Sequence, residues 1–456
     1  MRAVGLDLGT TKVACTVIDT EHRSVIRTLS REHDARIPSA SSWEVLQDPL
    51  RIEHAVNAIL AQVEESGGYD AICISGQMHG MLYVDERFEP VSPLFSWLDA
   101  RGGRTAASGA SYASELSERT GYRLAAGYGV VTHYYNVVNG LVPEGAAGVC
   151  TIVDWYAARL CGSSTPRWDP TLAASFGMFD LRNMRFDEHS FAACAPLSVR
   201  TPDLVPTGTL IGKEPRGRPV YGTIGDNQAS FLGSVRDIEG AALVNVGTGG
   251  QVSLFSRAAA GSQGRESSGG VEVRPFADGS LLVGAAVCSG RAYSLLEELF
   301  REVCREFTGI RETGPLFEKM NLLASGAPAG LTVDTRFNGT RLDPGVTGSI
   351  EGITLSNLTV GSLTRGFIGG IAEELARLYD ELLHRSGSAP AYLVGSGNAV
   401  RRNAVLRVEL ERRIGLPLRV PLESEEAALG AALCAAVGAG AYSSLADAGA
   451  MIAYEP

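Results

Sequence analysis

Residues 3–17 read AVGLDLGTTKVACTV, and the interpretation of the whole chain starts from this stretch. An apolar run, Val4–Leu8, carries Asp7 near its end, and a second β-branched run covers Val13–Ile18. The polar residues Gly9–Lys12 lie between these runs, so the pattern predicts a β-hairpin with a carboxylate close to its tip. Such a turn offers backbone N–H groups, two hydroxyls and an ammonium group, which suit phosphate oxygens. An ordinary surface hairpin has the same pattern, so the turn alone leaves both interpretations open.

A second turn of this kind occurs far downstream. Gly247–Gly250 reads GTGG and lies between the strand-like runs Ala241–Val246 and Gln251–Phe255. A third glycine-rich loop, Gly395–Asn398, follows an apolar run. Repetition of strand, Gly-Thr turn and strand suggests an internally duplicated fold. We expect the two turns to meet a nucleotide triphosphate from opposite sides, and the third loop to pack against its base.

Strand-like and helix-like segments alternate along the chain, which indicates an α/β fold. We expect domains at 1–235 and 236–456. Asp48 and Pro49 form an N-cap and first-turn pair that predicts a helix from residue 49. The Ala/Ser-rich residues 169–179 and the Gly/Ser-rich residues 256–280 are interpreted as loops, the latter as a mobile surface loop.

The bulk composition limits the classes of function. The chain of 456 residues is long enough for two or three domains. Its residues are 45% hydrophobic and 20% charged, and no apolar stretch reaches the length of a membrane span. A formal net charge of −11 argues against nucleic acid and anionic membranes as partners. The eight cysteines are scattered without a C-x-x-C pair, and the chain enters a strand without a basic leader. We therefore expect reduced core cysteines and a cytoplasmic protein. The oligomeric state stays open, a homodimer included.

Other nucleotide-binding signatures fail. No G-x-x-x-x-G-K-[ST] string is present, no strand is followed by G-x-G-x-x-G, and no protein-kinase H-R-D or D-F-G occurs. These three classes of nucleotide-binding protein are therefore disfavoured.

Gly225-Asp226-Asn227 supplies the strongest catalytic candidate. It follows the apolar strand-like run Val220–Ile224. Phosphoryl transfer needs a carboxylate that orients and deprotonates the attacking hydroxyl, and Asp226 suits that role. The alternative is an Asx turn in which Asp226 only caps the following helix.

Further candidates are ambiguous when taken singly. The loop Ser75–Gly80 (SGQMHG) follows a buried strand-like run, where ligands gather in α/β sheets. Trp97 with Asp99 suggests an apolar face beside a hydroxyl acceptor for a sugar, or simply a loop anchor. Asp7 could hold Mg²⁺ through water.

In their order, these motifs resemble the FGGY family of carbohydrate kinases, within the actin/hexokinase/heat-shock chaperone ATPase superfamily. The likeness covers essentially the whole chain. It is carried by Leu6–Lys12 (LDLGTTK), Ser75–Gly80 (SGQMHG), Trp97–Arg101 (WLDAR), Gly225–Asn227 (GDN), Val246–Gly249 (VGTG) and Gly395–Asn403 (GSGNAVRRN). SGQMHG is similar to both xylulokinases and sedoheptulokinases, whereas GDNQASFLGS, THYYN and DPTLAASFGMFD look closer to the sedoheptulokinase-like group.

The resemblance implies two actin-like (ribonuclease H-like) ATPase domains, with ATP and Mg²⁺ in the interdomain cleft. Asp226 would be the general base and Asp7 would lie near the metal. The implied sugar-binding residues are Gln77, Met78, His79, Trp97, Asp99 and Asn227. The implied ATP-binding residues are Gly9, Thr10, Thr11, Lys12, Gly247, Thr248, Gly249, Gly395, Ser396, Gly397, Asn398 and Asn403.

These observations predict an ATP- and Mg²⁺-dependent ketose kinase, with sedoheptulose as the favoured acceptor. Xylulose or another pentulose is the alternative acceptor. A non-catalytic, chaperone-like ATP-binding member of the superfamily is a different class, which has no need of the SGQMHG loop, Trp97 and Asp226-Asn227.

Overall fold

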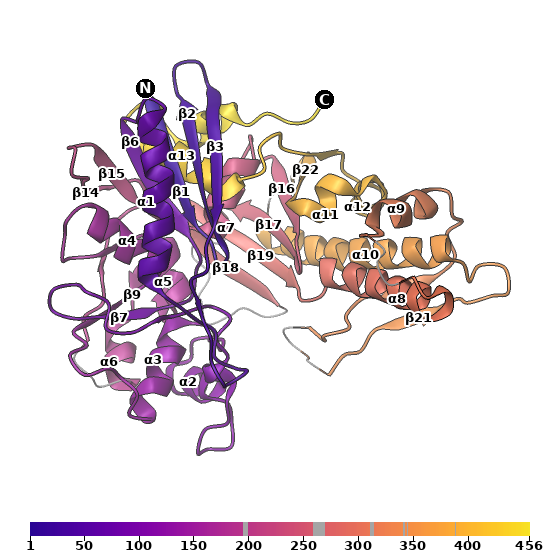
Figure 1. Ribbon diagram of the computed structural model, residues 1–456, viewed down its shortest axis with the longest axis horizontal. Helices are drawn as coiled ribbons and strands as arrows, with labels where there is room; N and C mark the ends of the chain where they lie inside the picture. Colours follow the sequence, from indigo (N-terminus) through magenta and orange to yellow (C-terminus); the bar gives the residue numbers. More distant parts are fainter. Residues whose placement is uncertain (195–198, 259–269, 311–313, 341–342, 344, 388) are drawn as a thin grey trace.

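The structure is a computed structural model that describes residues 1–194, 199–258, 270–310, 314–340, 343, 345–387 and 389–456. Two six-stranded sheets form its centre, the first from the N-terminal half and the second from the C-terminal half (Figure 1). The strand order is β14-β15-β6-β1-β2-β3 in the first sheet and β18-β19-β17-β16-β22-β23 in the second. This arrangement is the α/β fold with two actin-like domains that the sequence predicted.

The first sheet is built on the predicted hairpin. Strands β1 (Arg2–Leu8) and β2 (Lys12–Asp19) pair antiparallel, with Asp7 opposite Ala14. The sheet continues with β3 (Ser24–Glu32) on one side and with β6 (Ala71–Gly76), β15 (Pro219–Gly225) and β14 (Leu210–Lys213) on the other. Because β6 and β15 run parallel to β1, their carboxyl ends meet the hairpin tip at one edge.

The second sheet repeats this plan. Strands β16 (Ala241–Val246) and β17 (Gly250–Ser256) form an antiparallel hairpin, and β22 (Tyr392–Ser396) runs parallel to β16. The sheet is completed by β19 (Gly279–Ala286), β18 (Val271–Phe276) and β23 (Leu418–Arg419). The second Gly-Thr turn and the loop after β22 therefore lie at the same edge of this sheet.

Helices cover the faces of both sheets (Figure 1). Short strands outside the two large sheets lie between the helices along the chain. The larger helices are α1 (Pro49–Glu65), α2 (Tyr112–Thr120), α3 (Gly129–Val138), α4 (Ile152–Leu160), α7 (Asp226–Ser234), α8 (Gly290–Thr308), α9 (Phe317–Ser325), α10 (Val360–Ser386), α12 (Ala404–Ile414) and α13 (Glu426–Gly438). The shorter helices are α5 (Pro170–Phe176), α6 (Glu188–Cys194), α11 (Gly397–Arg402) and α14 (Leu445–Ala448). The remaining strands are β4 (Arg36–Ile37), β5 (Leu46–Gln47), β7 (Leu82–Val84), β8 (Leu94–Phe95), β9 (Gly148–Cys150), β10 (Arg167–Trp168), β11 (Phe179–Asp180), β12 (Arg185–Phe186), β13 (Asp203–Leu204), β20 (Thr332–Asp334) and β21 (Ser349–Glu351).

Helices α7 and α13 fill the space between the two sheets (Figure 1). They cross at glycines: a Cβ atom on Gly233 of α7 would lie 1.9 Å from the carbonyl oxygen of Glu426, and one on Gly430 of α13 would lie 1.9 Å from that of Ala229. A Cβ atom on Gly5 of β1 would similarly lie 2.0 Å from the carbonyl oxygen of Ala428. Helix α13 therefore packs on the first sheet, although it belongs to the C-terminal part of the sequence.

Most elements expected from the sequence are present. Asp48 caps α1 by accepting from the N–H groups of Leu50 and Arg51, with Pro49 in the first turn. All eight cysteines are free thiols, and six of them are buried. The segment 235–240 joins the two sheets, and we propose the domain division at residues 235 and 236 on that basis. No helix in the described part of the chain combines the length and apolarity of a membrane span.

Two expectations about loops were wrong. Residues 169–179 include the helix α5, in which Asp169 accepts from the N–H of Thr171 and Pro170 occupies the first turn. Of the expected loop 256–280, residues 271–276 form β18, which pairs with β19 along its whole length. Residues 259–269 of that loop lie outside the described residues.

Candidate functional site

The first Gly-Thr turn is held from several sides. His33 Nε2 lies 3.1 Å from the carbonyl oxygen of Gly9, and Gln47 Nε2 donates to the carbonyl oxygen of Thr10 at 2.7 Å. Gln47 in turn accepts a hydrogen bond from Gln77 at 2.9 Å. The first turn is thereby tied to the SGQMHG loop, while Thr11 remains exposed.

Lys12 is exposed at the end of this turn, where it forms an ion pair with Glu425 at 2.5 Å. Glu425 directly precedes α13, so the pair joins the first phosphate-binding candidate to the C-terminal part of the chain. Lys12 therefore lies at the tip of the hairpin as predicted, with a carboxylate as its partner. A phosphate oxygen can replace a carboxylate as the acceptor for an ammonium group.

Asp7 lies half-buried at the base of the same turn. Burial raises its pKa to about 7, and the nearby carboxylates of Asp226 and Glu425 add to the rise. Its Oδ1 atom is buried without a hydrogen-bond partner among the described residues. A carboxylate that is costly to leave charged and has an unpaired oxygen suits a cation.

The described residues contain no group of three or more His, Cys, Asp or Glu side chains placed to hold a metal ion. Mg²⁺ commonly keeps several waters and binds through one or two carboxylates together with the phosphates of a substrate. Asp7, with its unpaired Oδ1, fits a metal ion that arrives with a nucleotide.

Asp226 is the first residue of α7, directly after β15. The N-cap is Gly225, and no side chain caps this helix, so Asp226 does not form the Asx cap that was the structural alternative. Burial raises the pKa of the half-buried carboxyl to about 6, and the positive charge of Arg274 lowers it in part. A base with a pKa of about 6 is mostly ionised at neutral pH and still able to accept a proton.

Asp226 lies between the two Gly-Thr hairpins. On one side, its charge acts on Asp7 of the first hairpin. On the other side, its neighbour Asn227 donates from Nδ2 to Gln251 Oε1 at 2.7 Å, one residue beyond the second turn. The structure therefore brings both predicted phosphate-binding turns to the predicted base.

The second turn and the third loop lie side by side. Asn245 Nδ2 donates to Ser396 Oγ at 2.7 Å, joining β16 to the end of β22. In the second turn, the N–H of Gly247 donates to the carbonyl oxygen of Gly249, and the carbonyl oxygen of Thr248 accepts from the N–H of Arg291.

The third loop depends on backbone geometry. Gly397 has a φ of +81°, and a Cβ atom there would lie 2.6 Å from the carbonyl oxygen of Val246. Asn398 is exposed beside it, whereas Gly395 is buried in β22. Asn403 is buried, and its Oδ1 caps α12 by accepting from the N–H of Leu406.

A cavity of about 460 Å³, a volume within the usual range for small-molecule sites, is lined by Gln228, which lies on α7 two residues after Asp226. Met78, His79 and Trp97 line it, as predicted for the sugar pocket. A Cβ atom on Gly225 would lie 2.7 Å from Met78 Sδ, so Met78 packs directly against the residue before the base.

His79 is held in a strained conformation, with a φ of +71°. Its ring stacks on Tyr128 with centroids 4.6 Å apart, and its Nδ1 lies 2.9 Å from the carbonyl oxygen of Ser175. Because a carbonyl can only accept, Nδ1 carries the proton, and in the neutral ring Nε2 is an acceptor. His79 therefore presents the chemistry needed to accept from a sugar hydroxyl.

Trp97 connects this cavity to the first Gly-Thr turn. Its side chain is 46% exposed, and its Nε1 donates to Thr10 Oγ1 at 3.0 Å. An exposed indole beside a cavity offers the flat apolar face on which a sugar ring or chain can pack.

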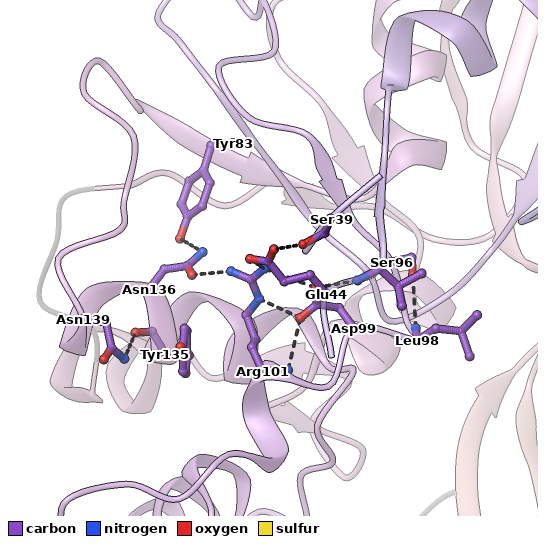
Figure 2. Close-up of polar contacts among 11 residues, drawn as sticks. Ser39, Glu44, Tyr83, Ser96, Leu98, Asp99, Arg101, Tyr135, Asn136 and Asn139 are labelled. Atoms are coloured by element: carbon purple, nitrogen blue, oxygen red, sulfur yellow. Dashed lines mark hydrogen bonds and ion pairs between the residues drawn. The ribbon is translucent and has the colours of Figure 1, made fainter. Parts of the chain in front are cut away.

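Asp99 is buried away from the cavity, in the polar network of Figure 2. It pairs with Arg101 at 2.6 Å and accepts from the N–H of Val45 at 3.1 Å. Arg101 also donates to Asn136, and its guanidinium lies over the ring of Phe95 at 4.2 Å. Asp99 is thus engaged in fixing the Trp97–Arg101 segment.

The described residues that line the cavity do not include Gln77, Asp99, Asp226 or Asn227. Other residues were not predicted from the sequence: Tyr128, Ser175, Glu272 and Arg274 in the cavity wall, and Gln47, Gln251 and Glu425 around the turns. The Asp169-Pro170 pair, a helix-start signal, could have located α5 and with it Ser175. No local signal points to Arg274.

The chain matches the models of a known protein family in both of its halves. Residues 2–233 match the N-terminal domain model of the FGGY family of carbohydrate kinases, and residues 244–439 match its C-terminal domain model. The chain is similar to sedoheptulokinase of Mus musculus, with 27% identity over 94% of this chain and 96% of that protein. It is also similar to xylulose kinase of Streptomyces coelicolor, with 26% identity over 95% of this chain and 87% of that protein.

Among solved structures, xylulose kinase from Rhodospirillum rubrum has the same fold, with a TM-score of 0.86 at 23% identity, covering 100% of this chain and 93% of that one. Gluconate kinase from Lactobacillus acidophilus has a TM-score of 0.82 at 18% identity, covering 100% and 92%. With both domain models matched in order, the chain belongs to the FGGY family of carbohydrate kinases, and it is a carbohydrate kinase.

Proposed function

We propose that this protein transfers the γ-phosphoryl group of ATP to a terminal hydroxyl of a ketose, with sedoheptulose as the favoured acceptor and sedoheptulose 7-phosphate as the product. The observation that carries the proposal is the position of Asp226: the preceding Gly225 packs against Met78 of the cavity wall, the charge of Asp226 acts on Asp7 at the first Gly-Thr turn, and the following Asn227 bonds to Gln251 beside the second turn. Sedoheptulose is favoured by the similarity to a sedoheptulokinase and by the GDNQASFLGS and DPTLAASFGMFD segments.

In this proposal Asp226 accepts the proton of the attacking hydroxyl. Its pKa of about 6 leaves it ionised at pH 7, so it can orient the hydroxyl and take up its proton as the O–P bond forms. Met78 and His79 position the sugar, with His79 Nε2 accepting from a hydroxyl, and Trp97 packs against its carbon chain. Gln77, Asp99 and Asn227 act through hydrogen bonds that hold these groups and the adjacent turns.

The two Gly-Thr turns, Gly9–Lys12 and Gly247–Gly249, bind the β- and γ-phosphates in this proposal, and Gly395–Asn398 packs against the adenosine. Asp7 is the residue that would hold Mg²⁺, which would neutralise phosphate charge when bound. Asn403 is assigned a supporting role as the cap of α12. Exclusion of water by the two halves keeps the phosphoryl group from hydrolysis.

Xylulose or another pentulose is the second candidate acceptor, favoured by the 26% identity to a xylulose kinase and by the SGQMHG loop. An assay that couples ADP release to NADH oxidation, run over a panel of ketoses and polyols, decides between them. We expect the highest kcat/KM with sedoheptulose. A higher value with xylulose would move the assignment to a pentulose kinase, and ATP turnover unaffected by any sugar would remove the proposed function.

A further inference from the structure

One wall of the cavity comes from the C-terminal half of the chain. Glu272, Val273 and Arg274 of β18 line the cavity together with Met78 and His79 of the first half. The strand lies at the edge of the second sheet and contacts α5 (Figure 1). Gln228 of α7 donates to the carbonyl oxygen of Pro275 at 3.3 Å, which fixes the strand beside the predicted base.

Arg274 is unusual because it is a cation that is only 8% exposed. Its Nε and Nη2 both donate to Glu272 Oε2, at 3.1 and 2.6 Å. Within the described part of the chain, Glu272 is the only hydrogen-bond acceptor for Arg274, and Nη1, which is not one of the buried atoms without a partner, remains accessible at the cavity wall. Its charge and that of Asp226 act on each other, so the guanidinium lies near the reacting end of the site.

With Nε and Nη2 held by Glu272, Nη1 is the guanidinium nitrogen that is left to donate to a ligand in the cavity. A guanidinium is a donor only, so a ligand that it contacts there has to offer an acceptor oxygen, such as the carbonyl or a hydroxyl of a sugar. The pairing with Glu272 fixes the plane of the fork and the direction of Nη1, which is the arrangement expected of a recognition group.

We propose that Arg274 determines the acceptor specificity of this kinase by donating from Nη1 to one oxygen of the bound sugar, while Glu272 holds the guanidinium in place. The inference rests on the proposed function, because it assigns a contact to that substrate. A site built to hydrogen-bond a substrate oxygen discriminates strongly against an analogue that lacks it. The sugar then contacts both halves of the molecule, Met78 and His79 on one side and Arg274 on the other.

The test compares wild type with Arg274→Gln and Arg274→Lys, using the best ketose of the panel and its monodeoxy analogues. We expect Arg274→Gln to raise KM for the sugar at least tenfold and to leave KM for ATP within twofold. Arg274→Lys keeps the positive charge but not the forked guanidinium. We expect its KM for the sugar to lie between those of wild type and Arg274→Gln. In wild type, kcat/KM for one monodeoxy analogue should be at least tenfold lower than kcat/KM for the parent ketose. In Arg274→Gln the two values should be similar.

Arg257→Gln is the matched control, because Arg257 lies in the same half and is likewise an arginine paired with carboxylates, Glu239 and Asp278, but is exposed and outside the cavity. It should leave both KM values unchanged. If Arg274→Gln does not fold, Glu272→Gln, which frees the guanidinium to move, should raise KM for the sugar by a smaller factor. Unchanged sugar KM and unchanged analogue discrimination in a folded, active variant would overturn the role of Arg274. If wild type phosphorylates no sugar, the proposed function itself fails.

Discussion

Asn227 and Gln251 form a hydrogen bond between the two halves of the molecule, in which Asn227 Nδ2 donates to Gln251 Oε1 at 2.7 Å. Asn227 follows the predicted base, and Gln251 follows the second Gly-Thr turn. The bond therefore couples the position of the predicted base to that of the second Gly-Thr turn, which we propose to bind phosphate. A shift of either half relative to the other changes the distance between the reacting groups, to which phosphoryl transfer is sensitive.

Replacing the base should remove turnover and spare nucleotide binding. In Asp226→Asn the side chain keeps its size but cannot accept the proton of the sugar hydroxyl, and a general base contributes about 10²–10⁴-fold to the rate. We expect kcat to fall by that factor, measured by ADP release, with ATP affinity within threefold by calorimetry. The exposed Asp237→Asn is the control, and near-normal turnover in Asp226→Asn would contradict the assignment.

The activity should depend on pH through the same carboxyl. Burial raises the pKa of Asp226 to about 6, so below pH 6 it is increasingly protonated and cannot act as a base. We expect kcat/KM for the sugar to fall about tenfold per pH unit below pH 6 and to level off above it. A profile measured at saturating ATP checks this, and an acid limb centred near pH 4 would contradict it.

The same shift predicts a change in stability. The folded protein holds the proton of Asp226 up to about pH 6, whereas the unfolded chain loses it near the ordinary value of 3.8. The stability due to this group is therefore full below pH 4 and is lost as the pH rises through 6. At pH 8, in metal-free buffer, Asp226→Asn should be more stable than wild type by about 1–3 kcal/mol, and the gain should shrink toward pH 5. Urea unfolding at the two pH values measures it.

The second Gly-Thr turn should tolerate no side chain at Gly249. A Cβ atom there would lie 2.9 Å from the carbonyl oxygen of Ala286, so Gly249→Val must displace the turn. We expect its affinity for ATP to fall at least tenfold by calorimetry. Gly326→Ala, where a Cβ atom meets nothing within 4 Å, is the control in the same half. Equal ATP affinity in both variants would show that the turn does not contact the nucleotide.

The crossing of α7 and α13 should be the most sensitive point of the fold. In Gly233→Ala the new methyl group would lie 1.9 Å from the carbonyl oxygen of Glu426, and the helices would have to separate. We expect a loss of about 1–3 kcal/mol in the free energy of unfolding, which is the usual cost of overpacking. Thermal or urea unfolding measures it against Gly326→Ala, and a loss below about 0.5 kcal/mol would contradict close contact.

Local sequence patterns predicted the hairpins and most helices, because glycine turns, apolar runs and Asp-Pro starts are short-range signals. The helix α5 was missed, although Asp169-Pro170 repeats the Asp48-Pro49 signal, because its Ala/Ser composition was given more weight. The strand β18 was missed because it follows a Gly/Ser-rich segment and its pairing with β19 is not visible in its own sequence.

The sequence predicted those candidate site residues that belong to recognisable motifs. It did not predict the residues that only tertiary packing brings to the cavity. Met78, His79 and Trp97 belong to motifs, and the structure places them around one cavity; Asp226 belongs to a motif too, and its neighbour Gly225 packs against Met78. Asp99 and Asn403 belong to motifs as well, but each is occupied by a local partner, Arg101 or the N–H of Leu406. Arg274 lines the cavity because it lies on β18, at the edge of the second sheet. Only the three-dimensional structure shows that this strand lies next to residues of the first half.

The packing of α13 on the first sheet has a consequence for biosynthesis. While the chain is being made, the ribosome releases β1, β6 and β15 long before residues 426–438 emerge from its exit tunnel. Until then the face of the first sheet that will receive α13 is uncovered, and exposed apolar surface of this kind promotes aggregation. We expect premature termination products that end before α13 to depend on chaperones, since they lack the helix that covers their own first sheet.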